Sequence, residues 1–129
     1  MPFDSLCKKK FFKDVPNLDN IQIDKFAYEL FSSVFTGMGG RYTRLRILCE
    51  IVVVSMNALQ ISKKLKLDYK TILYNLQVLI KNNLIIKEGN GYGDLYSPAE
   101  IVKSNLPTLY AVIRKVEAKL DVREKTYIE

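Results

Sequence analysis

The sequence contains no histidine, and this absence removes the commonest general base and metal ligand of proteins. The two cysteines, Cys7 and Cys49, form no Cys-x-Cys or Cys-x-x-Cys pair, so only a cysteine cluster between chains could bind a metal through thiolates. The carboxylates are scattered and mostly stand beside lysines, without the pairing that acid–base catalysis requires. We therefore expect a protein that is not an enzyme and that holds neither a metal nor another cofactor.

Long apolar runs are also absent, because no stretch approaches the roughly 20 residues that cross a bilayer. Residues 1–13 lack the apolar centre of a signal peptide. We expect a cytoplasmic protein without a membrane partner. Cys49 lies in an apolar run and is expected to be buried, whereas Cys7 lies in a basic segment. A reduced thiol is the expected state of Cys7, and an intermolecular disulfide is the alternative.

Positive charge, in contrast, is in excess by six, with 20 Lys and Arg against 14 Asp and Glu. The excess is unevenly distributed, since residues 41–103 carry ten basic and five acidic side chains while residues 1–40 carry five of each. A local excess of this kind indicates a segment that contacts nucleic acid. The alternative is surface charge that only keeps the protein soluble.

Residues 68–82 predict the central element, an amphipathic helix. Asp68 can accept hydrogen bonds from the free N–H groups of the first turn. Ile72, Leu76 and Leu79 repeat at the spacing of one buried helical face. The opposite face carries two cations, a phenol and an amide, and no acid: Lys70, Tyr74, Gln77 and Lys81. A basic, hydrogen-bonding face of this kind suits the major groove of DNA.

The segments on either side complete a helix-turn-helix with a wing. Residues 58–65 predict a short helix capped by Asn57, and residues 66–68 allow only a tight corner between the two helices. Residues 84–97 contain two short strand-like runs around a glycine-rich turn, which predicts a β-hairpin. The expected fold is mainly α with a small β-hairpin wing, an α+β arrangement.

With 129 residues, of which 48% are apolar, the chain is large enough for one folded domain. We divide it into an N-terminal arm (residues 1–18) and a single winged-helix domain (residues 19–129) with its core at residues 41–98. Residues 41–54 predict the first helix of this core, followed by a very short strand. In the arm, the basic and aromatic residues 8–13 could grip phosphates or a membrane surface. Packing of the phenylalanines onto the domain is the alternative.

Two extra helices are expected to flank the core, an N-terminal one in residues 19–36 and a C-terminal one in residues 99–129. Ser97 and Pro98 resemble the start of the latter, and Pro107 interrupts it. Both carry apolar stripes that a winged core does not need, which predicts a homodimer. The expected interface residues are Phe26, Leu30, Leu109, Ile113, Val116 and Leu120. The alternative is that both helices fold back over their own domain and leave a monomer.

Residues 40 to 98 resemble the winged helix-turn-helix regulators of the ArsR-like superfamily, especially small archaeal members. The resemblance is carried by Arg44, Ile47, Leu48, Asn57, Ala58, Ile61, Ser62, Leu65, Leu67, Asp68, Tyr69, Thr71, Leu76, Val78, Leu79, Asn83, Leu84, Ile85, Gly91, Tyr92, Gly93 and Tyr96. The sequence departs from the family at residues 73–75, which are often polar, Arg or His in such helices and are Leu, Tyr and Asn here.

The sequence and this resemblance predict a dimeric transcriptional regulator that binds specific sequences in double-stranded DNA. Residues 69–82 would form the recognition helix in the major groove, and the wing at residues 84–97 would contact the flanking groove. The expected DNA contacts are Arg44, Arg46, Lys63, Lys64, Tyr69, Lys70, Thr71, Tyr74, Asn75, Gln77, Lys81, Lys87, Asn90 and Tyr92. A winged-helix module that docks protein is the alternative, favoured by the apolar Leu73 near the outer face.

Overall fold

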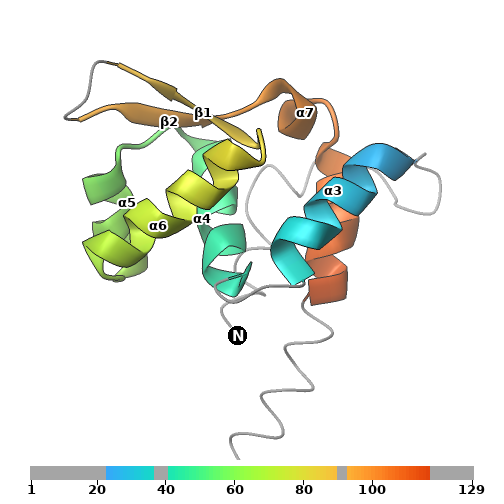
Figure 1. The fold of residues 1–129 in the computed structure, drawn as a ribbon, viewed down its shortest axis with the longest axis horizontal. Coiled ribbons are helices and arrows are strands. Elements are labelled where there is room, and N and C mark those ends of the chain that lie inside the picture. The colour runs from blue at the N-terminus through green and yellow to red at the C-terminus, as the bar shows by residue number, and fades with distance from the viewer. Residues whose placement is uncertain (1–22, 37–40, 90–92, 117–129) are drawn as a thin grey trace, which may run out of the picture.

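The computed structural model describes residues 23–36, 41–89 and 93–116. Its elements are α3 (Lys25–Thr36), α4 (Arg41–Val53), α5 (Ala58–Leu65), α6 (Tyr69–Lys81), β1 (Ile85–Glu88), β2 (Leu95–Pro98) and α7 (Glu100–Lys103), followed by a helix over residues 106–116. The hairpin lies above α4, α5 and α6. The helix α3 and residues 106–116 lie on the side of α4 that faces away from α5 and α6 (Figure 1). The predicted fold class, a winged helix-turn-helix with extra flanking helices, is confirmed.

Local hydrogen bonds define α5 as the sequence predicts. Asn57 Oδ1 accepts from Gln60 N at 2.8 Å, and Gln60 Oε1 accepts from Asn57 N at 2.8 Å, so the two side chains cap the helix reciprocally. The helix ends at Lys66, whose φ of 57° is left-handed. The corner to α6 is closed because Ser62 Oγ donates to Leu67 O at 2.6 Å.

Asp68 caps α6, since its Oδ2 accepts from Lys70 N at 3.0 Å and from Thr71 N at 3.3 Å. We expect Asp68→Ala to lower the free energy of unfolding by about 1 kcal/mol, because two N–H groups of the first turn lose their acceptor. Urea denaturation measures the change. Asp68→Asn, which keeps a capping oxygen, is the control, and equal stability of the two variants would contradict the role of the cap.

The wing is an antiparallel hairpin in which Ile85 pairs with Pro98 and Lys87 with Tyr96. Tyr96 also forms a bridge to Met56, with its N–H donating to Met56 O at 2.8 Å, so an isolated bridge stands where the very short strand was predicted. Gly89 has a φ of +131°, and a Cβ there would lie 2.3 Å from Asp94 Oδ1. A side chain at this position would therefore disturb the turn.

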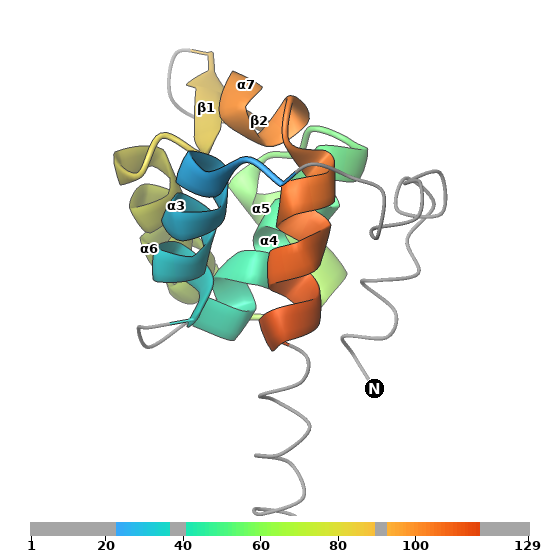
Figure 2. The same cartoon turned by 90° about the vertical axis from the view of Figure 1, so that its right-hand side faces the viewer.

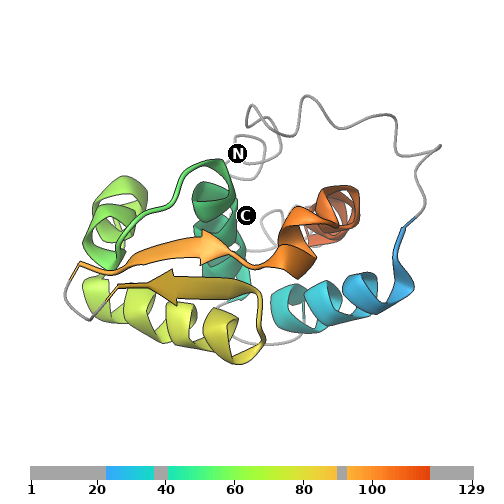
Figure 3. The ribbon, with the colours of Figure 1, turned by 90° about the horizontal axis from the view of Figure 1, so that it is seen from above.

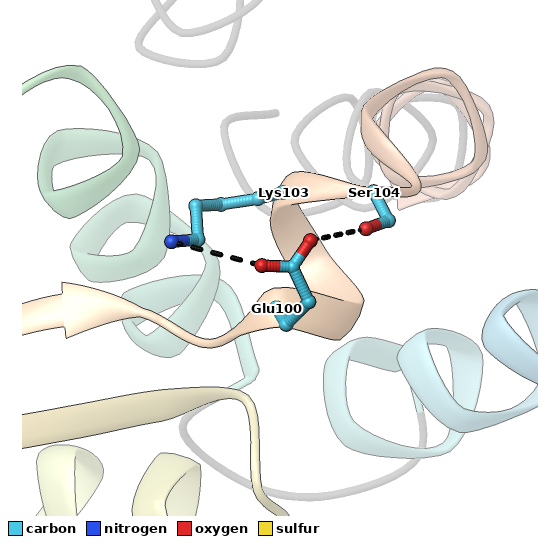
Figure 4. Close-up of polar contacts among 3 residues, drawn as sticks. All are labelled: Glu100, Lys103 and Ser104. Carbon is cyan, nitrogen blue, oxygen red and sulfur yellow. Dashed lines mark hydrogen bonds and ion pairs between the residues drawn. The ribbon is translucent and has the colours of Figure 1, made fainter.

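The expected start of the C-terminal helix at Ser97 and Pro98 is wrong, because both residues pair with β1 and belong to β2. The N-cap of α7 is Ala99, which makes no side-chain capping hydrogen bond. Instead, Glu100 accepts from Ser104 Oγ at 2.5 Å and lies 3.9 Å from Lys103 Nζ (Figure 4). Glu100 thus contacts side chains three and four residues later in the chain, and these contacts stabilise the single turn.

The helix α4 forms the centre of the core, since its buried residues point in nearly all directions. Leu45, Ile47, Leu48, Cys49 and Ile51 are all at most 1% exposed. A helix with buried side chains in so many directions has to be covered on more than one side. The helices α5 and α6 cover one side of α4, and α3 with residues 106–116 covers the other (Figure 2). Cys49 is buried, as the sequence predicts.

The two flanking helices are joined to each other within the chain. Asp24 N donates to Thr108 Oγ1 at 3.3 Å, and Lys115 Nζ lies 5.4 Å from the centre of the Tyr28 ring. Four residues of α3 and four residues of the last helix are buried: Ala27, Phe31, Val34 and Phe35, and Leu109, Val112, Ile113 and Val116. These contacts complete the core of one chain.

Three residues of the expected dimer interface are therefore corrected. Leu109 and Ile113 are fully buried and Val116 is 5% exposed in the single chain, so they cannot meet a partner. The physical reason is that α4 needs covering on the side away from α5 and α6. Phe26, in contrast, is 69% exposed, and Leu30 is half-buried. The arm at residues 1–18 and Leu120 lie outside the described residues.

Candidate nucleic-acid interface

The outer face of α6 is exposed and free of acidic residues. Ile72, Leu76 and Leu79 are fully buried on its inner side, as predicted. The opposite side presents Tyr69, Lys70, Thr71, Tyr74, Gln77 and Lys81, which are all exposed. Two of them are large aromatic side chains, since Tyr69 is 45% and Tyr74 58% exposed. The face combines charge, hydrogen-bonding groups and flat rings.

A second basic group lies at the end of α5. Lys63 and Lys64 occupy its last turn, where cations interact favourably with the helix dipole, and both are exposed. The helix α5 has no acidic residue either. Figure 3 shows α5 and α6 next to each other beneath the hairpin, so Lys63 and Lys64 extend the basic face of α6 at the corner.

A recess of about 620 Å³ separates α6 and the start of α5 from the wing. We call it the wing recess, and it is lined by Asn57, Ala58, Leu59, Tyr69, Leu73, Gln77, Lys87, Gly93, Asp94 and Tyr96. Lys87 Nζ lies 3.4 Å from Asp94 Oδ2, with the lysine side chain 43% exposed and the aspartate 4%. Burial raises the pKa of the Tyr96 phenol, and the nearby Lys87 charge lowers it in part.

Leu73 has a structural role in this recess. It is half-buried and packs against the core, so it is not an exposed apolar contact on the outer face. The observation that favoured a protein-docking module is therefore explained by intrachain packing.

Two expected DNA contacts, Arg44 and Asn75, are corrected because both are buried, with 0% and 2% exposure. Arg44 Nη1 donates to Asn75 Oδ1 at 3.0 Å, and the Arg44 Nε and Nη2 atoms donate to Val34 O. A side chain enclosed in this way reaches neither a phosphate nor a base. The spacing could have shown this for Asn75, which stands three residues after Ile72 and four before Leu79, within the buried stripe.

The remaining expected contacts differ in accessibility. Arg46 is half-buried, with its guanidinium carbon 5.6 Å from the centre of the Tyr42 ring, an arrangement that restrains it by a cation–π contact. Lys87 is exposed on the wing. Asn90 and Tyr92 lie outside the described residues. Within the described part of the chain, no three His, Cys, Asp or Glu side chains gather to hold a metal, and no helix is long and apolar enough to cross a membrane.

The arrangement defines a class of fold, the winged helix-turn-helix, here with an exposed basic face on α6. Among solved structures, the chain is similar to an ArsR-like transcriptional regulator from Rhodococcus sp. RHA1, with a TM-score of 0.51 and 16% sequence identity.

The aligned region covers 93% of the Rhodococcus chain and 79% of this one. A structure titled as reduced HlyU from Vibrio cholerae N16961 is matched with a TM-score of 0.49 and 14% identity, over 81% of this chain and 92% of that one. No family model matches the sequence, and no curated protein matches it either. The likeness to the Rhodococcus regulator shows that this chain shares its winged-helix fold.

Proposed function

We propose that this protein is a transcriptional regulator that binds specific sequences in double-stranded DNA as a homodimer. The observation that carries the proposal is the exposed, acid-free face of α6, with cations, phenols and an amide opposite a fully buried stripe. Such a face offers donors and acceptors to base edges in the major groove. The winged-helix fold supports this assignment. The location that we propose for this activity is the cytoplasm.

The proposed contacts divide into two kinds. Lys63, Lys64 and Lys87, with Arg46 at the margin, would neutralise phosphates and set the orientation of the protein on the duplex. Base edges would be read from the outer face of α6 by Tyr69, Lys70, Thr71, Tyr74, Gln77 and Lys81. Asn90 and Tyr92 at the tip of the wing stay predicted contacts to the flanking groove.

Selection of binding sites from a randomised duplex pool tests the proposed sequence specificity. We expect an enriched inverted repeat whose half-sites are about 34–36 Å apart, because two recognition helices related by a twofold axis reach successive major grooves. Lys70→Ala or Tyr74→Ala should weaken binding to the enriched site by roughly 1–3 kcal/mol and relax one base position. A pool that stays random after repeated selection would contradict sequence-specific binding.

The proposed dimer uses the outer side of α3 and the predicted contribution of Leu120. Phe26 is the most exposed large apolar side chain among the described residues, at 69%, and Leu30 is half-buried beside the core. The proposed dimer would bury this exposed apolar surface. A second copy of the chain supplies the twofold symmetry that an inverted-repeat site requires.

We expect Phe26→Asp to convert a wild-type dimer into a folded monomer, because the substitution places a charge in the interface without disturbing the core. Sedimentation at micromolar concentration measures the mass. Val54→Asp is the matched control, since Val54 is a 54% exposed apolar residue just beyond α4 and is not part of α3. A monomeric wild type, or a Phe26→Asp variant that stays dimeric, would show that this interface is wrong.

A further inference from the structure

A chain of buried hydrogen bonds joins the end of α3 to the first turn of the recognition helix. Arg44 Nε and Nη2 donate to Val34 O at 3.4 and 3.3 Å. Arg44 Nη1 donates to Asn75 Oδ1 at 3.0 Å, and Asn75 Nδ2 donates to Thr71 O at 2.9 Å. The chain therefore starts in α3, passes through α4 and ends on the backbone of α6.

Burying the charged Arg44 side chain costs free energy, and the hydrogen bonds that it makes have fixed directions. Arg44 is completely enclosed, and the loss of solvation lowers the pKa of its guanidinium, an effect that the Tyr74 phenol partly offsets. Apolar burial has no preferred direction of its own, so hydrogen bonds add a directional restraint to the packing of α6. Hydrogen bonds at both ends of the Asn75 amide fix its orientation and the rotation of α6 about its own axis.

The rotation of α6 controls where its outer side chains point. The outer surface of a helix lies about 5–6 Å from its axis, so a turn of about 20° moves a side chain by roughly 2 Å. Binding groups have to be held within about 0.5 Å of their working geometry. Thr71, whose carbonyl receives the last bond of the chain, stands next to Lys70 on the exposed first turn.

We propose that Arg44 and Asn75 are positioning residues. They do not touch DNA but determine how Lys70, Thr71 and Tyr74 are oriented toward the bases. This inference rests on the proposed function. It makes sequence discrimination depend on α3, because the Val34 carbonyl that receives Arg44 lies in the last turn of that helix. Phosphate contacts by Lys63 and Lys64, in contrast, do not depend on the rotation of α6.

The chain offers a matched control for Asn75. Asn82, at the other end of α6, also donates its Nδ2 to the carbonyl four residues earlier, Val78 O, at 2.8 Å. Asn82 has no bond to Arg44 among the described contacts. Asn82→Ala therefore removes the same local bond as Asn75→Ala but leaves the link between α3 and α6 intact.

The test compares binding to the selected site with binding to a random duplex, at a temperature where each variant is folded. We expect Asn75→Ala to lower the ratio of the two affinities by about tenfold, which corresponds to about 1.4 kcal/mol. Its salt dependence should stay that of the wild type, because the phosphate contacts are kept. Asn82→Ala should keep the wild-type ratio. Arg44→Lys, which keeps the charge but loses the fork of donors, should lower the ratio as well.

A second readout needs no DNA and covers the case in which Asn75→Ala does not fold. Residual dipolar couplings of folded Arg44→Lys should show the N–H vectors of α6 rotated relative to those of α4. Unchanged α6 vectors together with an unchanged affinity ratio would overturn the inference. If the wild type itself does not distinguish the selected site from random duplex, the proposed function fails, and the orientation of α6 in the variants then decides the inference alone.

Discussion

Replacing Ile113 by Asp is expected to unfold the domain and not merely to separate a dimer. Ile113 has no exposed surface within the single chain, where it helps to cover α4. The substitution removes a buried aliphatic side chain and encloses an unpaired carboxylate, two effects that together cost more than about 4 kcal/mol. Thermal and urea denaturation, followed by far-ultraviolet circular dichroism, measure the loss.

Arg114→Asp is the control for this experiment, because Arg114 is the next residue on the same helix and is exposed. We expect it to stay within about 0.5 kcal/mol of the wild type, as surface substitutions usually do. A stable, monomeric Ile113→Asp protein would contradict the intrachain packing. It would instead support a dimer interface that contains Leu109, Ile113 and Val116, as their spacing suggests.

The second large effect concerns the charge at the corner of α5 and α6. We expect the double change Lys63→Glu and Lys64→Glu to weaken binding to random duplex DNA by at least about 100-fold, at roughly tenfold for each lost phosphate contact. The slope of log K against log salt should fall in magnitude by about 1.8, since each neutralised phosphate contributes about 0.9. Fluorescence anisotropy across a salt series measures both quantities.

Lys103→Glu with Arg114→Glu gives the same change in net charge away from α5 and α6, as the positions of α7 and residues 106–116 in Figure 1 show. We expect this control to lose much less affinity and to keep the wild-type slope. Equal losses for the two double variants would mean that DNA responds only to net charge. The acid-free face of α5 and α6 would then have no special part in binding.

The helix-turn-helix could be predicted from the sequence because its signals are local. Asn57 and Asp68 cap helices through residues two or three positions away, and both caps occur as the spacing indicates. The buried stripe of α6 follows from the helical repeat alone. The hairpin was predicted as well, but Ser97 and Pro98 were assigned to the next helix, because pairing with β1 is not visible in a local capping pattern.

The parts that could not be predicted depend on contacts distant in the sequence. Arg44 resembles a surface cation until the end of α3 and Asn75 enclose it, and Asn75 lies 31 residues away. The apolar repeat of Leu109, Ile113 and Val116 fits a partner chain and a neighbouring helix of the same chain equally well. The sequence does not show that α4 has to be covered on both sides, and this requirement decides between the two.

The central claim is that the face of α5 and α6 binds duplex DNA through its positive charge. The most direct measurement is the affinity of the wild-type protein for a random duplex of about two helical turns, at salt concentrations from about 50 to 200 mM. We expect log K to fall linearly with log salt, with a slope that corresponds to several phosphate contacts per protein. No binding at the lowest salt concentration, or an affinity that does not change with salt, would contradict it.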